Sequence, residues 1–175
     1  KMDGLSDNDF RDYYENNHAP IASSLLSFEG YERNYINTEL NPLYSSLGSI
    51  SIFKYKSMKS LEVVSKQMSS DAGDTLRDDE LKFMDASKNY FVLTESKQLT
   101  EQEFNKKIFY SANSENDLNL LDSFSGINKI SNNLFVEPNK TIGIAEYGIN
   151  QNVSFDTLKH LMKEHPQALI ASCIS

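Results

Sequence analysis

The sequence predicts an α+β fold in which two similar halves follow one another along the 175 residues. Three observations predict it. The expected elements of the second half run strand, helix, strand, strand, helix, strand. The first half has the same order without the opening strand. The strands are short runs of aromatic and β-branched residues, and the helices between them are amphipathic.

The first helix is expected to begin after Ser6, whose hydroxyl can accept a hydrogen bond from the amide of Asp9 in a short version of the capping box. Pro20 should break or kink this helix, because proline disfavours helical geometry in the residue before it. Three side chains recur every four residues and share one helix face: Phe10, Tyr14 and His18.

The remaining elements follow from periodicity and turn residues. The first half should contain strands at 31–36 and 50–55, a helix over 61–68, an acidic segment over 71–85 and a strand at 90–94. A short linker helix is expected at 99–104. The second half should contain strands at 107–111, 127–136, 141–147 and 169–174, with helices over 115–124, capped by Ser114, and over 155–164, capped by Ser154.

A β-α-β-β-α-β unit is a ferredoxin-like half, with both helices on one face of an antiparallel sheet. Its other face is apolar and needs a partner sheet. Halves 1–98 and 99–175 can supply this partner to each other and close one intrachain α+β barrel, so we expect a monomer or a homodimer. Because the first half lacks its opening strand, we expect residues to be missing before Lys1.

Composition excludes several classes of function. The formal net charge is -8, and the longest basic cluster is Lys106 with Lys107, so nucleic acid is not an expected partner. Cys173 is the single cysteine, which rules out an intrachain disulfide. No apolar run reaches the roughly 18 residues of a membrane span, and no leader precedes Leu5. We therefore expect a cytoplasmic protein that does not bind membranes.

His18 is the first candidate for chemistry, because it lies beside Pro20 on the helix face that also presents the hydroxyl of Tyr14. Histidine suits proton transfer near neutral pH, since its ordinary pKa is about 6.5. The alternative is that His18 only satisfies backbone groups at a helix end.

The acidic segment supplies a possible partner for His18. Asp79 and Phe83 are four residues apart on one helical face, with Glu80 displaced from them, so the Asp79 carboxylate can orient His18. The alternative is a solvated acidic helix terminus, stabilised by the helix dipole.

Neither a metal nor a cofactor is expected. His160 and His165 do not share a helix face, and no carboxylate or cysteine is spaced to complete a tetrahedral site. The chain also lacks a phosphate-binding glycine loop and a nucleophile elbow.

Together, the two segments resemble the EthD family of the dimeric α+β barrel superfamily. That family pattern is an aromatic-rich helix ending in H-x-P, followed later by D-E-x-x-F-x-D ahead of the last strand. The first motif is present here over residues 4–20, with His18-Ala19-Pro20 at its end, and the second over residues 79–85, before a strand that closes on Glu95. The resemblance covers residues 1 to about 95. The second half has neither motif, so one working site per chain is expected.

The resemblance implies a protein acting on a small hydrophobic or aromatic molecule. Our preferred hypothesis is a cofactor-independent lyase of the dehydratase or decarboxylase type, acting on a cyclic or aromatic carbonyl compound. His18 would be the general acid or base, Asp79 would hold it, and Tyr14 and Phe83 would line the substrate site. In this hypothesis the hydroxyl of Tyr14 can donate a hydrogen bond to an enolate oxygen.

Three alternatives stay open. The chain can be a non-catalytic binding or accessory protein that uses the same apolar cavity. The other two are a cofactor-free monooxygenase and a haem-handling protein, since neighbouring families of the superfamily include both. A shared fold does not determine the function.

Overall fold

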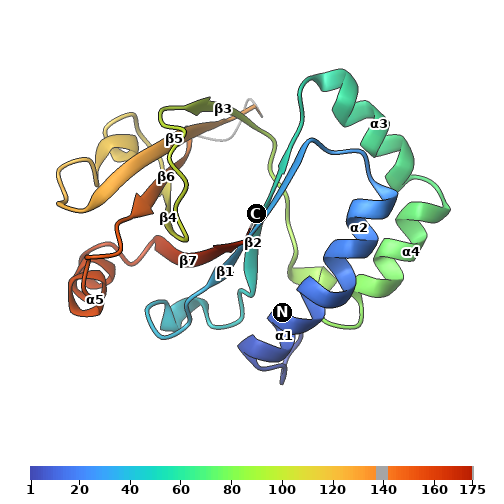
Figure 1. Cartoon of the computed structure of the whole chain (residues 1–175), viewed down its shortest axis with the longest axis horizontal. Coiled ribbons are helices and arrows are strands. Elements are labelled where there is room, and N and C mark those ends of the chain that lie inside the picture. The colour runs from blue at the N-terminus through green and yellow to red at the C-terminus, as the bar shows by residue number, and fades with distance from the viewer. Residues whose placement is uncertain (137–141, 175) are drawn as a thin grey trace. The chain divides into compact units, whose positions relative to one another are not determined.

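The computed structural model describes residues 1–136 and 142–174. The chain forms two compact units (Figure 1). Unit 1 consists of Lys1–Tyr35 and Ser46–Tyr90, and unit 2 of Ile36–Ser45 and Phe91–Ile174. The α+β class predicted from the sequence is confirmed. The division into ferredoxin-like halves at residue 98 and the closure of those halves into one barrel stay predictions.

Unit 1 combines four α-helices with an antiparallel strand pair. Strands β1 (Gly30–Ile36) and β2 (Ser49–Lys54) pair so that Tyr31 lies opposite Phe53 and Arg33 opposite Ser51. Figure 1 shows α2 and α3 beside α4. The helices, in order, are α1 (Asp7–Tyr13), α2 (Ala19–Leu25), α3 (Met58–Met68) and α4 (Asp71–Glu80), with a π-helical turn, Tyr14–His18, joining the first two.

The turn from α3 into α4 depends on one glycine. A Cβ atom on Gly73 would lie 2.0 Å from the carbonyl oxygen of Met68, closer than any side chain tolerates. The absence of a side chain at Gly73 therefore allows α4 to start directly against the end of α3, and this sets the position of the acidic segment that follows.

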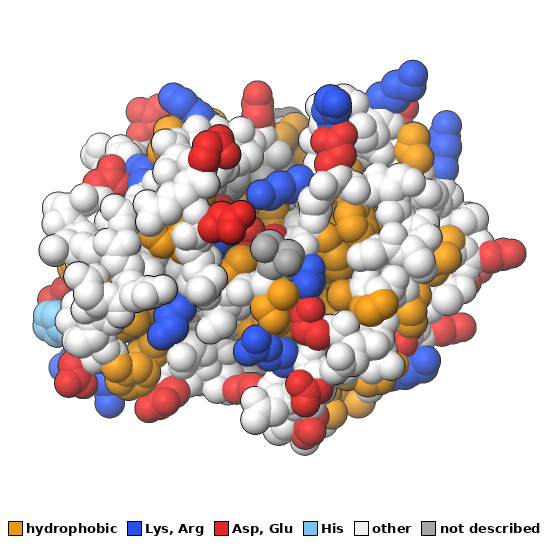
Figure 2. Space-filling view, in the orientation of Figure 1, with side chains coloured by type: hydrophobic (Ala, Val, Ile, Leu, Met, Phe, Trp, Pro, Cys, Tyr) orange, Lys and Arg blue, Asp and Glu red, His pale blue; other side chains and the backbone are white. Residues whose placement is uncertain are grey.

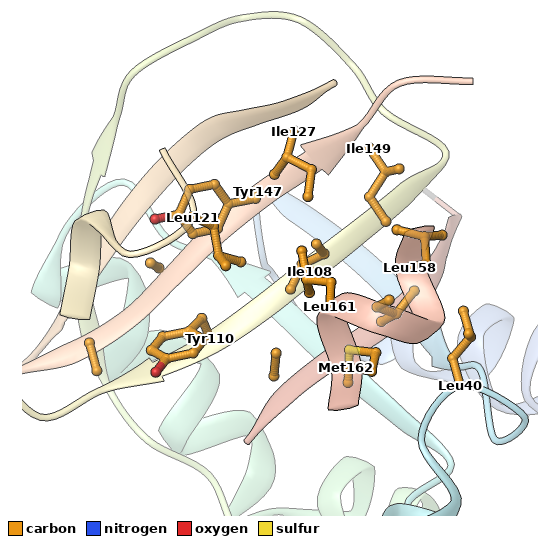
Figure 3. Close-up of a cluster of buried hydrophobic side chains, with 14 of the residues drawn as sticks. Leu40, Ile108, Tyr110, Leu121, Ile127, Tyr147, Ile149, Leu158, Leu161 and Met162 are labelled. Carbon is orange, nitrogen blue, oxygen red and sulfur yellow. The ribbon is translucent and has the colours of Figure 1, made fainter. Parts of the chain in front are cut away.

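Unit 2 is a five-stranded antiparallel sheet with one α-helix. The strand order is β7-β4-β6-β5-β3, and the helix is α5 (Phe155–Glu164). The strands are β3 (Thr94–Gln98), β4 (Lys106–Ala112), β5 (Ile127–Phe135), β6 (Gly143–Ile149) and β7 (Ala168–Ile174). Figure 3 shows how α5 packs through Leu158, Leu161 and Met162 onto Ile108 of β4, which forms the core of this unit.

Several predicted elements are confirmed. Ser6 caps α1 by accepting from the amide of Asp9 at 3.1 Å, and Ser154 caps α5 by accepting from the amide of Thr157 at 3.1 Å. The strands predicted at 31–36, 107–111, 127–136 and 169–174 lie within two residues of β1, β4, β5 and β7. The strand predicted at 141–147 corresponds to β6, and its first residue, Thr141, lies outside the described residues.

The helix predicted at 115–124 is wrong. The structure has a single 3-10 turn, Asp117–Asn119, although Ser114 does accept a hydrogen bond from the amide of Asp117 as predicted. Side chains compete with the helix here: Asp117 accepts from the amide of Asn113, and Asn119 donates to the carbonyl of Glu115.

Two further predictions around the boundary of the units are wrong. The strand predicted at 90–94 begins only at Thr94, because pairing with β5 starts there, and Tyr90 and Phe91 are 83% and 92% exposed. None of the described residues pairs with Tyr90 or Phe91, and aromatic β-propensity alone does not form a strand. No helix forms at 99–104; instead the Thr100 hydroxyl accepts from the amide of Gln102 in a local turn.

The charged surface is mixed. Figure 2 shows Lys and Arg side chains scattered among Asp and Glu on the face that it displays. Lys107 is buried in β4, where its ammonium group lies 2.8 Å from a carboxylate oxygen of Glu146. Within residues 1–136 and 142–174, no helix is long and apolar enough to cross a membrane.

Candidate active site

His18 lies at the end of the π-helical turn of unit 1, and Pro20 does not break the helix there. The amide of Ala19 donates to the carbonyl of Tyr14, five residues earlier, and Ala19 has helical torsion angles. The predicted break is therefore wrong. A widened turn accommodates proline because Pro20 has no N–H to place in the regular helical ladder. The α2 helix then continues from Ala19, and His18 is only 5% exposed.

The imidazole of His18 faces the carboxylate of Asp79, which lies in the last turn of α4. Its Nδ1 atom is 2.9 Å from Oδ2 of Asp79, and the two side chains are 6% and 3% exposed. The other carboxylate oxygen, Oδ1, accepts from the hydroxyl of Tyr13 at 2.7 Å and from the ammonium group of Lys82 at 3.3 Å. His18 and Asp79, predicted from distant segments, are therefore brought together.

The partners of Asp79 keep it ionised. Burial by itself would raise the pKa of this carboxyl, but hydrogen bonds from Tyr13, His18 and Lys82 outweigh burial and hold the pKa below its usual value. An ionised carboxylate can only accept hydrogen bonds, so Nδ1 of His18 must be the donor.

The second ring nitrogen of His18 is consequently left with a lone pair when the ring is neutral. Nε2 has no hydrogen-bond partner among the described residues. It is also not among the fully enclosed polar atoms without a partner, which in this part of the chain are Oδ1 of Asn34 and of Asn132. The imidazole is thus oriented through Nδ1 and keeps an unused lone pair at Nε2.

Aromatic rings surround this pair. Phe83 is fully buried, and its ring centroid lies 5.0 Å from that of His18 and 5.2 Å from that of Tyr14. Phe10 and Tyr13 complete the cluster around Phe83, at 5.5 Å and 5.0 Å. The four predicted site residues therefore lie in one cluster. That Tyr14 and Phe83 bind substrate stays a prediction.

The sequence reasoning missed a clamp that holds the π-helical turn to β1. Both guanidinium nitrogens of Arg33 that face Glu15 donate to its carboxylate, at 3.1 and 2.9 Å, and the hydroxyl of Tyr35 donates to the same group. These contacts outweigh burial, which alone would raise the pKa of Glu15, and lower that pKa below its usual value. The period-two alternation of Tyr31, Arg33 and Tyr35 along β1 was the available signal for this face.

Glu80 was set aside in the sequence as displaced from its neighbours, but it lies half-buried at the end of α4, on the face that also buries Leu76 four residues before it. Burial raises the pKa of Glu80, although the nearby charge of His18 opposes this. A group with a raised pKa binds more protons in the folded state than in the unfolded state. Its contribution to stability therefore falls as the pH rises from the ordinary pKa of a glutamate to the raised pKa.

Replacing Glu80 by Gln is therefore expected to raise the free energy of unfolding at pH 7 by about 0.5–1 kcal/mol, because the desolvated charge is removed. The gain should shrink as the pH is lowered toward 4. Urea denaturation at the two pH values measures it, with Glu62→Gln on the exposed side of α3 as control. A destabilised Glu80→Gln protein at pH 7 would contradict this account.

Unit 1 also has a surface hollow of about 420 Å³, next to the end of α4. It is lined by Met2, Asp3, Leu81 and residues 84–87, and none of the four predicted site residues lines it. Across the described residues, no three His, Cys, Asp or Glu side chains gather in an arrangement that could hold a metal ion.

The two motifs of the sequence thus converge on one paired histidine, and the comparison with protein families agrees with them. Residues 2–87 match the family model of the EthD domain. This part of the chain is an EthD domain. The EthD domain includes α1 to α4 and all four predicted site residues, and it ends before β3. No curated protein and no solved structure was found to match the chain.

Proposed function

We propose that the EthD domain is a cofactor-independent lyase of the dehydratase type, acting on a small cyclic or aromatic carbonyl compound. The observation that supports it is the His18–Asp79 pair, in which Nδ1 is held by a buried carboxylate and Nε2 has no hydrogen-bond partner among the described residues. This is the arrangement of an oriented general base.

The neutral imidazole would take a proton at Nε2 from the carbon next to the substrate carbonyl. The C–H electron pair moves toward the carbonyl oxygen and gives an enolate, while Asp79 stabilises the imidazolium through Nδ1–H. When the carbonyl re-forms, the bond from the β-carbon to its hydroxyl breaks. The leaving hydroxide takes the proton from His18, so a β-hydroxy ketone gives an enone and water.

The aromatic cluster around Phe83 also favours a second candidate, a non-catalytic protein that binds a small hydrophobic or aromatic molecule. Such a carrier would use the same rings but would not move a proton.

Exchange of the α-protons of 2-tetralone in D2O, followed by NMR, separates the two candidates without knowledge of the natural substrate. The wild-type protein is expected to accelerate the exchange, and His18→Gln should lose about 100-fold of this acceleration because glutamine cannot accept the proton as a base. His160→Gln is the control, since the His160 side chain is 71% exposed on α5.

Binding of 2-tetralone without accelerated exchange would favour the carrier. Equal exchange rates for the wild-type and His18→Gln proteins would contradict the assignment of His18 as the base.

A further inference from the structure

Beside the His18–Asp79 pair, three hydroxyl groups form a chain in unit 1. The hydroxyl of Tyr31 on β1 donates to that of Tyr14 in the π-helical turn at 2.7 Å. The hydroxyl of Tyr14 lies 2.7 Å from Oγ of Ser51 on β2. Tyr31 and Ser51 occupy the same face of the strand pair, because Tyr31 lies opposite Phe53, two residues beyond Ser51.

Burial decides the direction of the protons along this chain. Tyr14 is 4% exposed, so leaving its O–H without an acceptor would cost free energy. Tyr31 already donates to Tyr14, so the acceptor for the Tyr14 proton is Ser51. The proton of the Ser51 hydroxyl is then left at the end of the chain, and it has no acceptor among the described residues. Ser51 is half-buried, so a ligand can reach it.

The surroundings keep both tyrosines of the chain protonated. Burial raises the pKa of both Tyr14 and Tyr31, which therefore stay donors. The guanidinium group of Arg33 lies 5.0 Å from the ring centroid of Tyr31, and its charge is paired with the carboxylate of Glu15. Donors linked in series polarise one another, so the last hydroxyl is a stronger donor than an isolated serine.

We propose that the chain Tyr31–Tyr14–Ser51 is the binding site for a carbonyl or phenolic oxygen of the ligand, with Ser51 as the donor that touches it. This assignment rests on the proposed function for its place in the reaction, where Ser51 would stabilise the enolate oxygen while His18 takes the proton. The rings of Tyr14 and His18 lie 5.1 Å apart, so the hydroxyl chain and the His18–Asp79 pair share one aromatic cluster. Tyr14 then acts through Ser51 as a positioning residue.

The probe for this site is 4-nitrophenol, because its phenolate and phenol forms have different visible spectra. A spectrophotometric pH titration with the wild-type protein should show binding and a lower pKa for the bound phenol than for the free one. Ser51→Ala should weaken binding of the phenolate about tenfold and remove most of the pKa change, as expected for losing one hydrogen bond to a charged group.

Two control variants and one further test variant accompany the measurement. Ser51→Thr keeps the hydroxyl and should bind within about threefold of wild type. Ser65→Ala, on the exposed face of α3, should change nothing. Tyr31→Phe removes the hydrogen bond into Tyr14 and should weaken binding about threefold.

Equal affinity of the wild-type and Ser51→Ala proteins, or no binding of 4-nitrophenol by wild type at millimolar concentration, would overturn the inference. This test needs no turnover. If proton exchange depends on His18 but 4-nitrophenol binding does not depend on Ser51, the inference fails alone. If binding depends on Ser51 but exchange does not depend on His18, the proposed function fails alone.

Discussion

Replacing Phe83 by Ala is expected to lower the free energy of unfolding by about 3–5 kcal/mol, the usual cost of deleting a buried phenylalanine ring. Phe83 is fully buried, and its ring packs against those of Phe10, Tyr13, Tyr14 and His18. Deleting the Phe83 ring leaves a cavity. The neighbouring rings cannot fill it completely, because their backbones are held in α1 and the π-helical turn. The buried end of the His18 ring would also lose one of its packing surfaces.

Urea denaturation followed by circular dichroism measures this loss, and two variants make it specific. Phe83→Leu keeps most of the volume and should cost less than about 2 kcal/mol. Phe91→Ala removes a ring that is 92% exposed and should change stability by less than about 0.5 kcal/mol. A Phe83→Ala protein as stable as the Phe91→Ala protein would show that this cluster is not a core.

Replacing Asp79 by Ala is expected to lower the free energy of unfolding at pH 7 by about 1–3 kcal/mol for each buried donor that loses its acceptor. Nδ1 of His18 and the hydroxyl of Tyr13, which both donate to this carboxylate, would lose their acceptor. Asp78→Ala is the matched control, since Asp78 is exposed on the same helix.

The pH dependence follows from the lowered pKa of Asp79. A carboxyl whose pKa is lower in the folded state stabilises the protein above its unfolded pKa, near the ordinary value of 3.8, and loses this effect as pH falls through the folded pKa. The difference between the wild-type and Asp79→Ala proteins should therefore be largest near neutral pH and decrease below about pH 4. A difference that grows on acidification would contradict an ionised, hydrogen-bonded Asp79.

The His18 ring gives a second readout for Asp79→Ala. The two nitrogens of a neutral imidazole have different 15N chemical shifts, depending on which one has the proton. We expect the proton of wild-type His18 to lie on Nδ1, where Asp79 accepts it. In the Asp79→Ala protein the proton should no longer prefer Nδ1. A general loss of packing elsewhere in the protein would not change which ring nitrogen has the proton.

Much of the candidate site could be predicted from the sequence because its motifs are local. The capping segment at Ser6 and the four-residue spacing of Tyr14 and His18 each describe one helical stretch. Asp79 and Phe83 were expected on one helix face, but α4 ends at Glu80 and Phe83 lies in the turn that follows it. Helix periodicity is a short-range property, so it can be recognised without the fold. The acidic segment suggested that Asp79 orients His18, and the family resemblance then placed both residues in one pair of motifs.

Other parts of the site could not be predicted because they depend on how strands and helices meet. The hydroxyl of Ser51 on β2 meets Tyr14 only because β1 and β2 pair in a register that puts Ser51 opposite Arg33. The clamp of Arg33 on Glu15 likewise joins a strand to the π-helical turn. Such contacts bring together residues with no shared local pattern.

The sequence by itself determined the α+β class, the helix caps, most of the strands and the identity of the EthD segment, since these depend on local periodicity and motif spacing. The tertiary structure decided where local signals competed. The helix continues through Pro20 because the preceding turn is π-helical. Tyr90 and Phe91 are not in a strand, because the described pairing with β5 begins at Thr94. A strand needs a partner strand, and a buried polar group needs a hydrogen-bonding partner. In this protein residues far away in the chain supply both.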